Sequence, residues 1–148
     1  MLRKYRDLGS MPDGLMKAKE DLVKGMIVAR EKVGEEYQIA KPKDTDGVGV
    51  YGFVTLREDE AVYKESHYDT IEKGKRAVVY TLVPNNEWAT DQFEGDVKTL
   101  KIGDQMFANT TGKLKKVTSS ETALFEVIGT QEAMAGYENA MVIVKVLP

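Results

Sequence analysis

Short apolar runs alternate with polar turn residues along most of the chain. From Lys24 onward, runs rich in β-branched and aromatic residues are separated by Gly, Asn, Asp or Pro at intervals of about ten residues. This spacing predicts an antiparallel sandwich or barrel, because strands are usually about 5–6 residues long and reverse direction at such turn residues. We expect strands at 26–29, 36–40, 48–56, 76–83, 97–100, 105–108, 113–117, 123–128 and 140–147.

The last of these runs, AMVIVKVL at 140–147, is apolar at almost every position, and four of its eight residues are β-branched. Such a run is typical of a strand that is covered on both faces, whereas a half-exposed strand alternates polar and apolar residues. We therefore predict that 140–147 is a central strand.

The first 21 residues have a different character. Gly9, Ser10, Pro12, Asp13 and Gly14 follow one another closely, and each favours a turn or interrupts a regular element. We expect residues 1–21 to form an extended N-terminal arm and residues 22–148 to form the domain. The predicted fold class is all-β: a small antiparallel β-barrel or sandwich with an extended N-terminal arm and at most short helices. Such an arm is expected to be mobile alone and ordered on a partner, because it has too little apolar surface to offset its ordering entropy.

The segment DGVGVYGFV at 46–54 contains the spacing Gly47-x-Gly49-x-x-Gly52, which in many enzymes binds the pyrophosphate of a dinucleotide. That chemistry requires a strand before the glycines and a helix after them, because the phosphates lie on the first N–H groups of the helix. Here KPKDTD at 41–46 predicts a turn before the glycines, and the residues that follow predict a strand. We therefore interpret the glycines as structural, marking a bend in a strand or the close approach of another chain segment.

Composition narrows the class of protein further. A chain of 148 residues suits one domain, and the absence of cysteine excludes disulfides and thiolate metal sites. The net charge of −3 is uneven, since residues 1–32 hold eight Lys/Arg and five Asp/Glu while the remainder holds thirteen and nineteen. An acidic body argues against a nucleic-acid-binding surface, and the apolar run near the start is too short for a signal peptide or membrane span. The distribution permits a basic arm that lies on an acidic partner.

The sequence shows no catalytic constellation. The only histidine, His67, has Glu65 and Asp69 at alternating positions that would share one face of a strand. A general base or a metal site could use this trio, but a lone histidine in the densely charged segment 57–75 is typical of an exposed surface. No Ser, Thr or Lys has a base partner recognisable in the sequence. We expect no enzyme activity, no cofactor and no metal.

The segment NNEWATDQFEGD at 85–96 carries four acids, no base and the only tryptophan of the chain. If Trp88 and Phe93 are exposed, they are candidates for an interface anchor or a sugar-stacking platform, because Trp offers a large contact area at low entropic cost. The alternative is that Trp88 folds back over the end of the barrel. The sequence leaves both interpretations open.

The order of short segments along 22–148 resembles that of the small decoration or cement proteins of tailed-phage capsids. The segments that carry the resemblance are LVKGMIVAR (22–30), DGVGVYGFVTL (46–56), KGKRAVVYTL (73–82), LKIGDQMFANTTGKLKKV (100–117), FEVIGT (125–130) and NAMVIVKVL (139–147). In those proteins a strand enters with Lys-Gly, a Gly-Asp turn leads to a hairpin, and the last strand closes a small barrel.

The resemblance implies a structural virion protein, made in the host cytoplasm, that binds the outer surface of a phage capsid. It would cement neighbouring subunits of the major capsid protein and associate with itself as a trimer or a dimer on the shell. We expect contact between copies through the strand 140–147 and the segment around Trp88, and no nucleic-acid or membrane partner.

Two other interpretations remain open: another virion β-module, such as a tail tube, a head fibre or a receptor-binding domain, and a carbohydrate-binding domain that uses Trp88. The residues expected to contact the capsid or another partner are Leu2, Arg3, Lys4, Tyr5, Arg6, Leu8, Met11, Leu15, Trp88 and Phe93.

Overall fold

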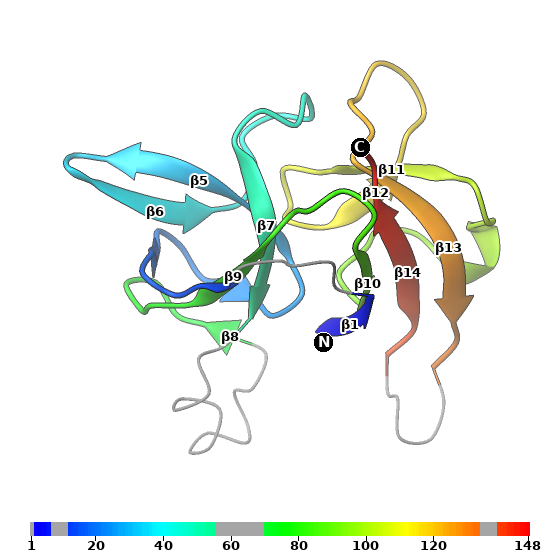
Figure 1. Ribbon diagram of the computed structural model, residues 1–148, viewed down its shortest axis with the longest axis horizontal. Coiled ribbons are helices and arrows are strands. Elements are labelled where there is room, and N and C mark those ends of the chain that lie inside the picture. Colours follow the sequence, from blue (N-terminus) through cyan, green and yellow to red (C-terminus); the bar gives the residue numbers. More distant parts are fainter. Residues whose placement is uncertain (1, 7–11, 56–69, 134–138) are drawn as a thin grey trace.

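The computed structural model describes residues 2–6, 12–55, 70–133 and 139–148, which form an all-β fold of two six-stranded sheets and one two-stranded sheet. The two large sheets lie side by side and pack against each other without closing into a barrel (Figure 1). This confirms the all-β class and the antiparallel sandwich-like architecture predicted from the turn spacing.

The first large sheet, sheet A, is antiparallel throughout and contains most of the C-terminal half. Its strands, in spatial order, are β1 (Leu2–Arg6), β10 (Glu87–Thr90), β14 (Met141–Val146), β13 (Phe125–Gln131), β11 (Gln105–Ala108) and β12 (Leu114–Lys116). Four of the six residues of β14 are buried, and β14 pairs with strands on both sides. The prediction of a central strand at 140–147 is confirmed.

The second large sheet, sheet B, contains the N-terminal half. Its strands, in spatial order, are β2 (Pro12–Asp13), β9 (Val78–Thr81), β7 (Val50–Thr55), β5 (Ile27–Val33), β6 (Glu36–Ala40) and β3 (Lys17–Ala18). All of its pairs are antiparallel except β3 with β6. The two-stranded sheet joins β4 (Leu22–Val23) to β8 (Thr70–Ile71).

Sheet B separates two hydrophobic cores, because successive side chains of a strand point to opposite faces. In the first core, on one face of sheet B, Ile27 and Phe53 pack with Trp88 and the inner side chains of sheet A. In the second core, on the other face, Val28 and Val54 pack with residues of β3, β4 and β8. The runs of β5 and β7 are apolar at consecutive positions for this reason, since both of their faces are covered.

Some predicted boundaries agree with the structure and others do not. The strands 36–40 and 105–108 are confirmed, whereas 97–100 is wrong, because Val97–Thr99 forms a 3₁₀ turn. Its Asp96 side chain accepts a hydrogen bond from the Lys98 N–H at 3.0 Å, which caps the turn. The prediction also missed β10, because the acidic residues of segment 85–96 are not typical of a buried strand.

The first residues are integrated into both sheets, whereas the sequence suggested an arm outside the domain. Strand β1 pairs with β10, and β2 and β3 extend the two edges of sheet B. Met16 and Ala18 are buried in the second core. Residues 2–6 and 12–18 therefore contribute packing as well as surface.

The charged segment 57–75 is only partly described, and His67, Glu65 and Asp69 lie outside the described residues. At its C-terminal end, Ile71 is buried and pairs with Leu22, so this end belongs to the core and not to the exposed surface that we expected. Within the described ranges, no helix has the length and apolar character needed to span a membrane.

Candidate docking surface

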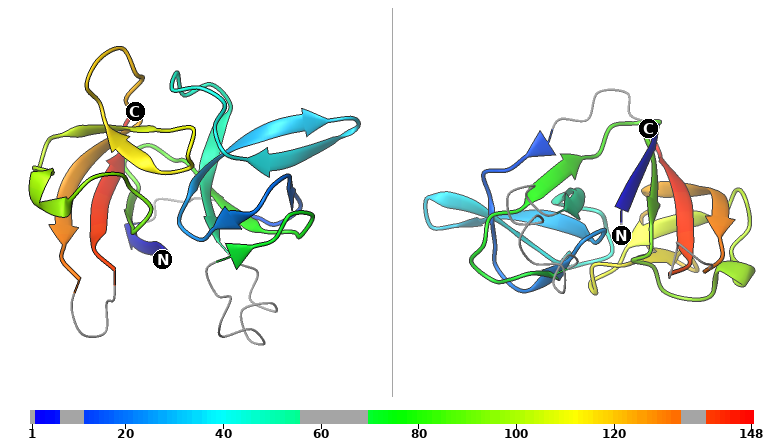
Figure 2. Two further views of the ribbon diagram at one scale, coloured as in Figure 1. Left: turned by 180° about the vertical axis from the view of Figure 1, so that it is seen from behind. Right: turned by 90° about the horizontal axis from the view of Figure 1, so that it is seen from below.

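The β5–β6 hairpin extends beyond the rest of sheet B (Figure 1; Figure 2, right), and Arg30, Glu36 and Tyr37 of the candidate surface lie on it. Val33 pairs with Glu36, which leaves a two-residue loop whose first residue, Gly34, has a φ of 62°. This is the loop position at which a type II′ hairpin requires glycine. Because most residues between Arg30 and Tyr37 are exposed, the hairpin presents two accessible faces.

One face holds an arginine between two tyrosines. The Arg30 guanidinium carbon lies 4.5 Å from the ring centroid of Tyr37 and 4.8 Å from that of Tyr51, within the range of cation–π attraction. The Tyr51 hydroxyl donates to Asp13 Oδ2 at 2.8 Å, and burial, followed by this carboxylate, raises the pKa of Tyr51. The hydroxyl therefore stays protonated at neutral pH and holds β2 against β7.

A pocket of ≈ 270 Å³ opens on this face, and we call it the Arg30 pocket. Its lining residues are Asp13, Leu15, Met16, Arg30, Glu36, Tyr37 and Arg76. Arg76 Nη1 donates to the Leu15 carbonyl at 2.6 Å, which fixes the segment after β2. Leu15 itself is 78% exposed and Tyr37 is 48% exposed, so apolar surface borders the two guanidinium groups.

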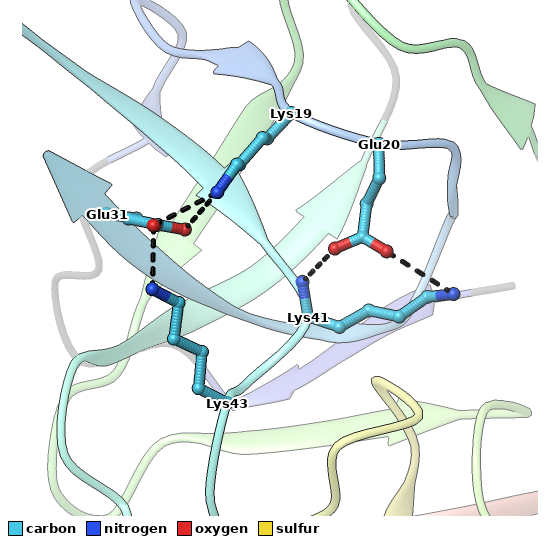
Figure 3. Close-up of polar contacts among 5 residues, drawn as sticks. All are labelled: Lys19, Glu20, Glu31, Lys41 and Lys43. Carbon is cyan, nitrogen blue, oxygen red and sulfur yellow. Dashed lines mark hydrogen bonds and ion pairs between the residues drawn. The ribbon is translucent and has the colours of Figure 1, made fainter. Parts of the chain in front are cut away.

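The opposite face is an ion-pair network (Figure 3). Glu31 accepts from Lys19 Nζ at 3.0 and 3.1 Å and from Lys43 Nζ at 2.7 Å, while Glu20 accepts from the Lys41 backbone N–H at 3.1 Å. Hydrogen bonds from Lys43 and Lys19 lower the pKa of Glu31. The charges on this face are paired within the molecule, and the network ties the segment after β3 and the segment after β6 to β5.

This network should make the protein sensitive to acid. Because the pKa of Glu31 is lower in the folded state, its contribution is present above the unfolded value of 4.5 and is lost as pH falls through the folded value. Glu31→Gln should lower the melting temperature at pH 7 and flatten its decline below about pH 5. The matched control is Glu35→Gln at the exposed hairpin loop. Parallel melting-temperature curves for wild type and Glu31→Gln would contradict this role.

The structure places the predicted contact residues in different environments. Leu2 packs against the first core, and Lys4 Nζ lies 4.2 Å from the Tyr80 ring centroid. Tyr5 and Arg6 are exposed, Arg3 is half-buried, and Leu8 and Met11 lie outside the described residues.

The aromatic pair of the acidic segment is not an exposed platform. Trp88 is only 1% exposed, and Phe93 packs against the same core. Of the two interpretations of Trp88, the structure shows the inward-facing one, because β10 lies between β1 and β14 and directs the indole into the core, so Trp88 is not the contact residue that we had named.

Leu15 is the predicted contact residue that lies in the Arg30 pocket, together with Arg30, Tyr37 and Arg76, which the sequence analysis missed. The sequence feature that could have indicated this pocket is Tyr37, an aromatic residue that follows Gly34 and two glutamates. Only the tertiary structure brings it near Arg76, because 39 positions separate the two residues in the chain.

The three glycines do not open a helix. Gly47 and Gly49 have φ values of 78° and 77° in the turn before β7, and Gly52 lies within β7. A Cβ on Gly52 would meet the Tyr80 carbonyl oxygen and lie 2.7 Å from the Tyr80 carbonyl carbon, so the backbone of β9 approaches closely here. Within the described part of the chain, no cluster of three or more His, Cys, Asp or Glu residues is placed to hold a metal ion.

The fold has a counterpart among phage structures. The chain is similar to the head fiber gp8.5 N base of bacteriophage phi29, with a TM-score of 0.56. The match covers 99% of this chain and 94% of the other, at 13% sequence identity. At that identity the likeness shows a shared fold. No family model and no curated protein sequence matches the chain.

Proposed function

We propose that the chain is a structural protein of a tailed-phage particle that attaches to the outer surface of the head. The observation that carries the proposal is the likeness to a head-fibre base over nearly the whole of both chains. The segment order that resembles capsid decoration proteins supports it independently. Both lines support a structural β-domain of a phage particle.

Within that class, the role we propose is cementing neighbouring subunits of the major capsid protein. A protein that binds only the assembled shell stabilises that state by mass action, by about 2.7 kcal/mol per site at a free concentration 100 times Kd. The second candidate is the base of a head fibre, which the phi29 counterpart favours. A fibre base must hold its own appendage, whereas a cement protein must resist separation of the subunits beneath it.

The structure leads us to propose different surfaces for contact between copies on the shell. Trimers, or dimers, remain our proposal, because symmetric clusters match the local symmetry of an icosahedral lattice. The two surfaces expected to join copies are unsuitable, since β14 is a central strand and Trp88 is buried. Strand β1, an edge strand on which Tyr5 and Arg6 are exposed, is the better candidate for contact between copies.

The carbohydrate-binding alternative depended on an exposed Trp88, which the structure buries. A sugar-stacking platform requires an exposed aromatic face, and the face of Trp88 is covered by Phe53 and Tyr80, whose ring centroids lie 5.8 and 5.2 Å away.

The proposal is tested by mixing the purified protein with heads of the phage that encodes it, prepared without the protein. We expect co-sedimentation with the heads in saturable amounts and no co-sedimentation with unassembled capsid subunits. If the role is cementing, saturation should raise the temperature at which the heads disassemble. Binding without any rise would favour the fibre base, and the absence of binding to heads would refute the proposal.

A further inference from the structure

The Arg30 pocket contains two arginines, Arg30 and Arg76, beside the carboxylates of Asp13 and Glu36. Neither Arg30 nor Arg76 makes a salt bridge with any residue that the structure describes. On the other face of the same hairpin, Lys19, Lys41 and Lys43 each lie within 4.0 Å of a glutamate oxygen. Among the described residues, the two guanidinium groups of the pocket therefore stay outside any ion pair, and each keeps N–H groups that a partner can bind.

The geometry of Arg30 prepares it for a carboxylate. Tyr37 and Tyr51 lie against the guanidinium, and this stacking restricts the side chain before any partner arrives. A planar guanidinium held in this way loses little entropy when it forms two parallel hydrogen bonds to a carboxylate. Arg76 is held by its bond to the Leu15 carbonyl and lines the same pocket.

The acidic residues of the lining restrict what the pocket accepts. Both Asp13 carboxylate oxygens are engaged, Oδ1 by the Leu15 N–H at 3.1 Å and Oδ2 by the Tyr51 hydroxyl. Glu36 adds a negative charge to the lining, which disfavours a polyanion such as nucleic acid but tolerates one carboxylate between two arginines. The exposed Leu15 and Tyr37 offer apolar contact to residues beside that carboxylate.

We propose that the Arg30 pocket is a docking site for an acidic segment of the head subunit, with one Asp or Glu carboxylate bound by Arg30 and Arg76. Apolar residues that flank this carboxylate pack against Leu15 and Tyr37. The inference rests on the proposed attachment to the head and names the surface and the chemistry of that attachment. Arginine and tyrosine are enriched among the residues that dominate binding energy at protein interfaces.

The test compares variants for binding to heads that lack the protein. Arg30→Gln and Arg76→Gln should each weaken binding by at least about tenfold and reduce its salt dependence. Lys43→Gln is the matched control, because it removes the same charge from the opposite face of the hairpin, and it should bind within about twofold of wild type. Free hexaglutamate should compete with the heads, and hexalysine should not.

The outcomes separate this inference from the proposed function. If wild type binds heads and both arginine variants bind equally well, the docking site is refuted and attachment to the head stands. Equal weakening by Lys43→Gln would also refute the site, since it would show a general effect of charge. Because Arg30→Gln removes a stacked side chain, a melting curve is recorded for each variant, and Arg76→Gln alone decides the outcome if Arg30→Gln unfolds.

Discussion

Replacing Gly52 with alanine should lower the free energy of unfolding by more than about 3 kcal/mol, a large share of the roughly 5–15 kcal/mol that stabilises a typical domain. The added Cβ would collide with the backbone carbonyl of Tyr80 in β9, and a backbone group in a central strand has no alternative rotamer. Relief would require β7 and β9 to separate, which would break the pairing of Gly52 with Thr81 and disturb both cores. Urea denaturation followed by far-UV circular dichroism measures the effect.

Two other glycines provide matched controls for Gly52→Ala. Gly129 lies in β13, where a Cβ would meet only the Ile143 side chain at 3.5 Å, so Gly129→Ala should change stability little. At Gly49 a Cβ would meet the Arg30 carbonyl oxygen at an ordinary contact distance of 3.7 Å, but φ is 77°, so Gly49→Ala should cost about 1 kcal/mol through backbone strain. If Gly52→Ala unfolds at the same urea concentration as Gly129→Ala, the close approach of β9 is refuted.

Replacing Trp88 with alanine should cost about 3–5 kcal/mol, because it removes the largest buried side chain and leaves a cavity between the two sheets. Trp88 packs against Phe53 of β7 and Tyr80 of β9, so its indole joins sheet A to sheet B. The same urea titration measures the loss, and the tryptophan fluorescence of wild type should resist quenching by iodide because the side chain is buried.

Trp88→Phe is the control that separates packing from the polar group. The buried indole Nε1 has no hydrogen-bond partner among the described residues, so phenylalanine loses volume but also removes a donor that those residues leave unsatisfied. We therefore expect Trp88→Phe to cost less than half as much as Trp88→Ala. Strong iodide quenching in wild type, or a small effect of Trp88→Ala, would contradict the placement of Trp88 in the core.

The local pattern of the sequence was sufficient where each element is defined by its own residues. Strands β6 and β11 were predicted at their observed bounds, because short apolar runs between turn residues mark them. The interpretation of the Gly47-x-Gly49-x-x-Gly52 spacing as structural also required only the neighbouring residues. Val97–Thr99 was misassigned because several local hydrogen bonds form a 3₁₀ turn there: the Lys98 N–H donates to the Asp96 side chain, and the Thr99 N–H and hydroxyl donate to the Asp96 carbonyl.

The candidate site was much less accessible to sequence analysis. Leu15 was predicted as a contact residue, but its neighbours Arg30, Tyr37 and Arg76 come from β5, β6 and the segment before β9. No spacing in the sequence predicts that these four residues form one pocket, because they come from segments that are tens of residues apart in the chain. Trp88 was named as a contact residue although the sequence left its exposure open, and only strand pairing placed the side chain inside.

The sequence by itself determined that the protein is an antiparallel β-domain whose last strand is central. The alternation of polar and apolar residues, the β-branched runs and the turn residues that define these strands act over a few neighbouring positions. The tertiary structure alone decided which faces are covered and which charges remain unpaired. Sheet B is covered on both sides, residues 2–6 and 12–18 complete the sheets, and two arginines remain without ion pairs among the described residues. These properties depend on contacts between distant segments, and a linear pattern of polar and apolar residues carries no information about which segments meet.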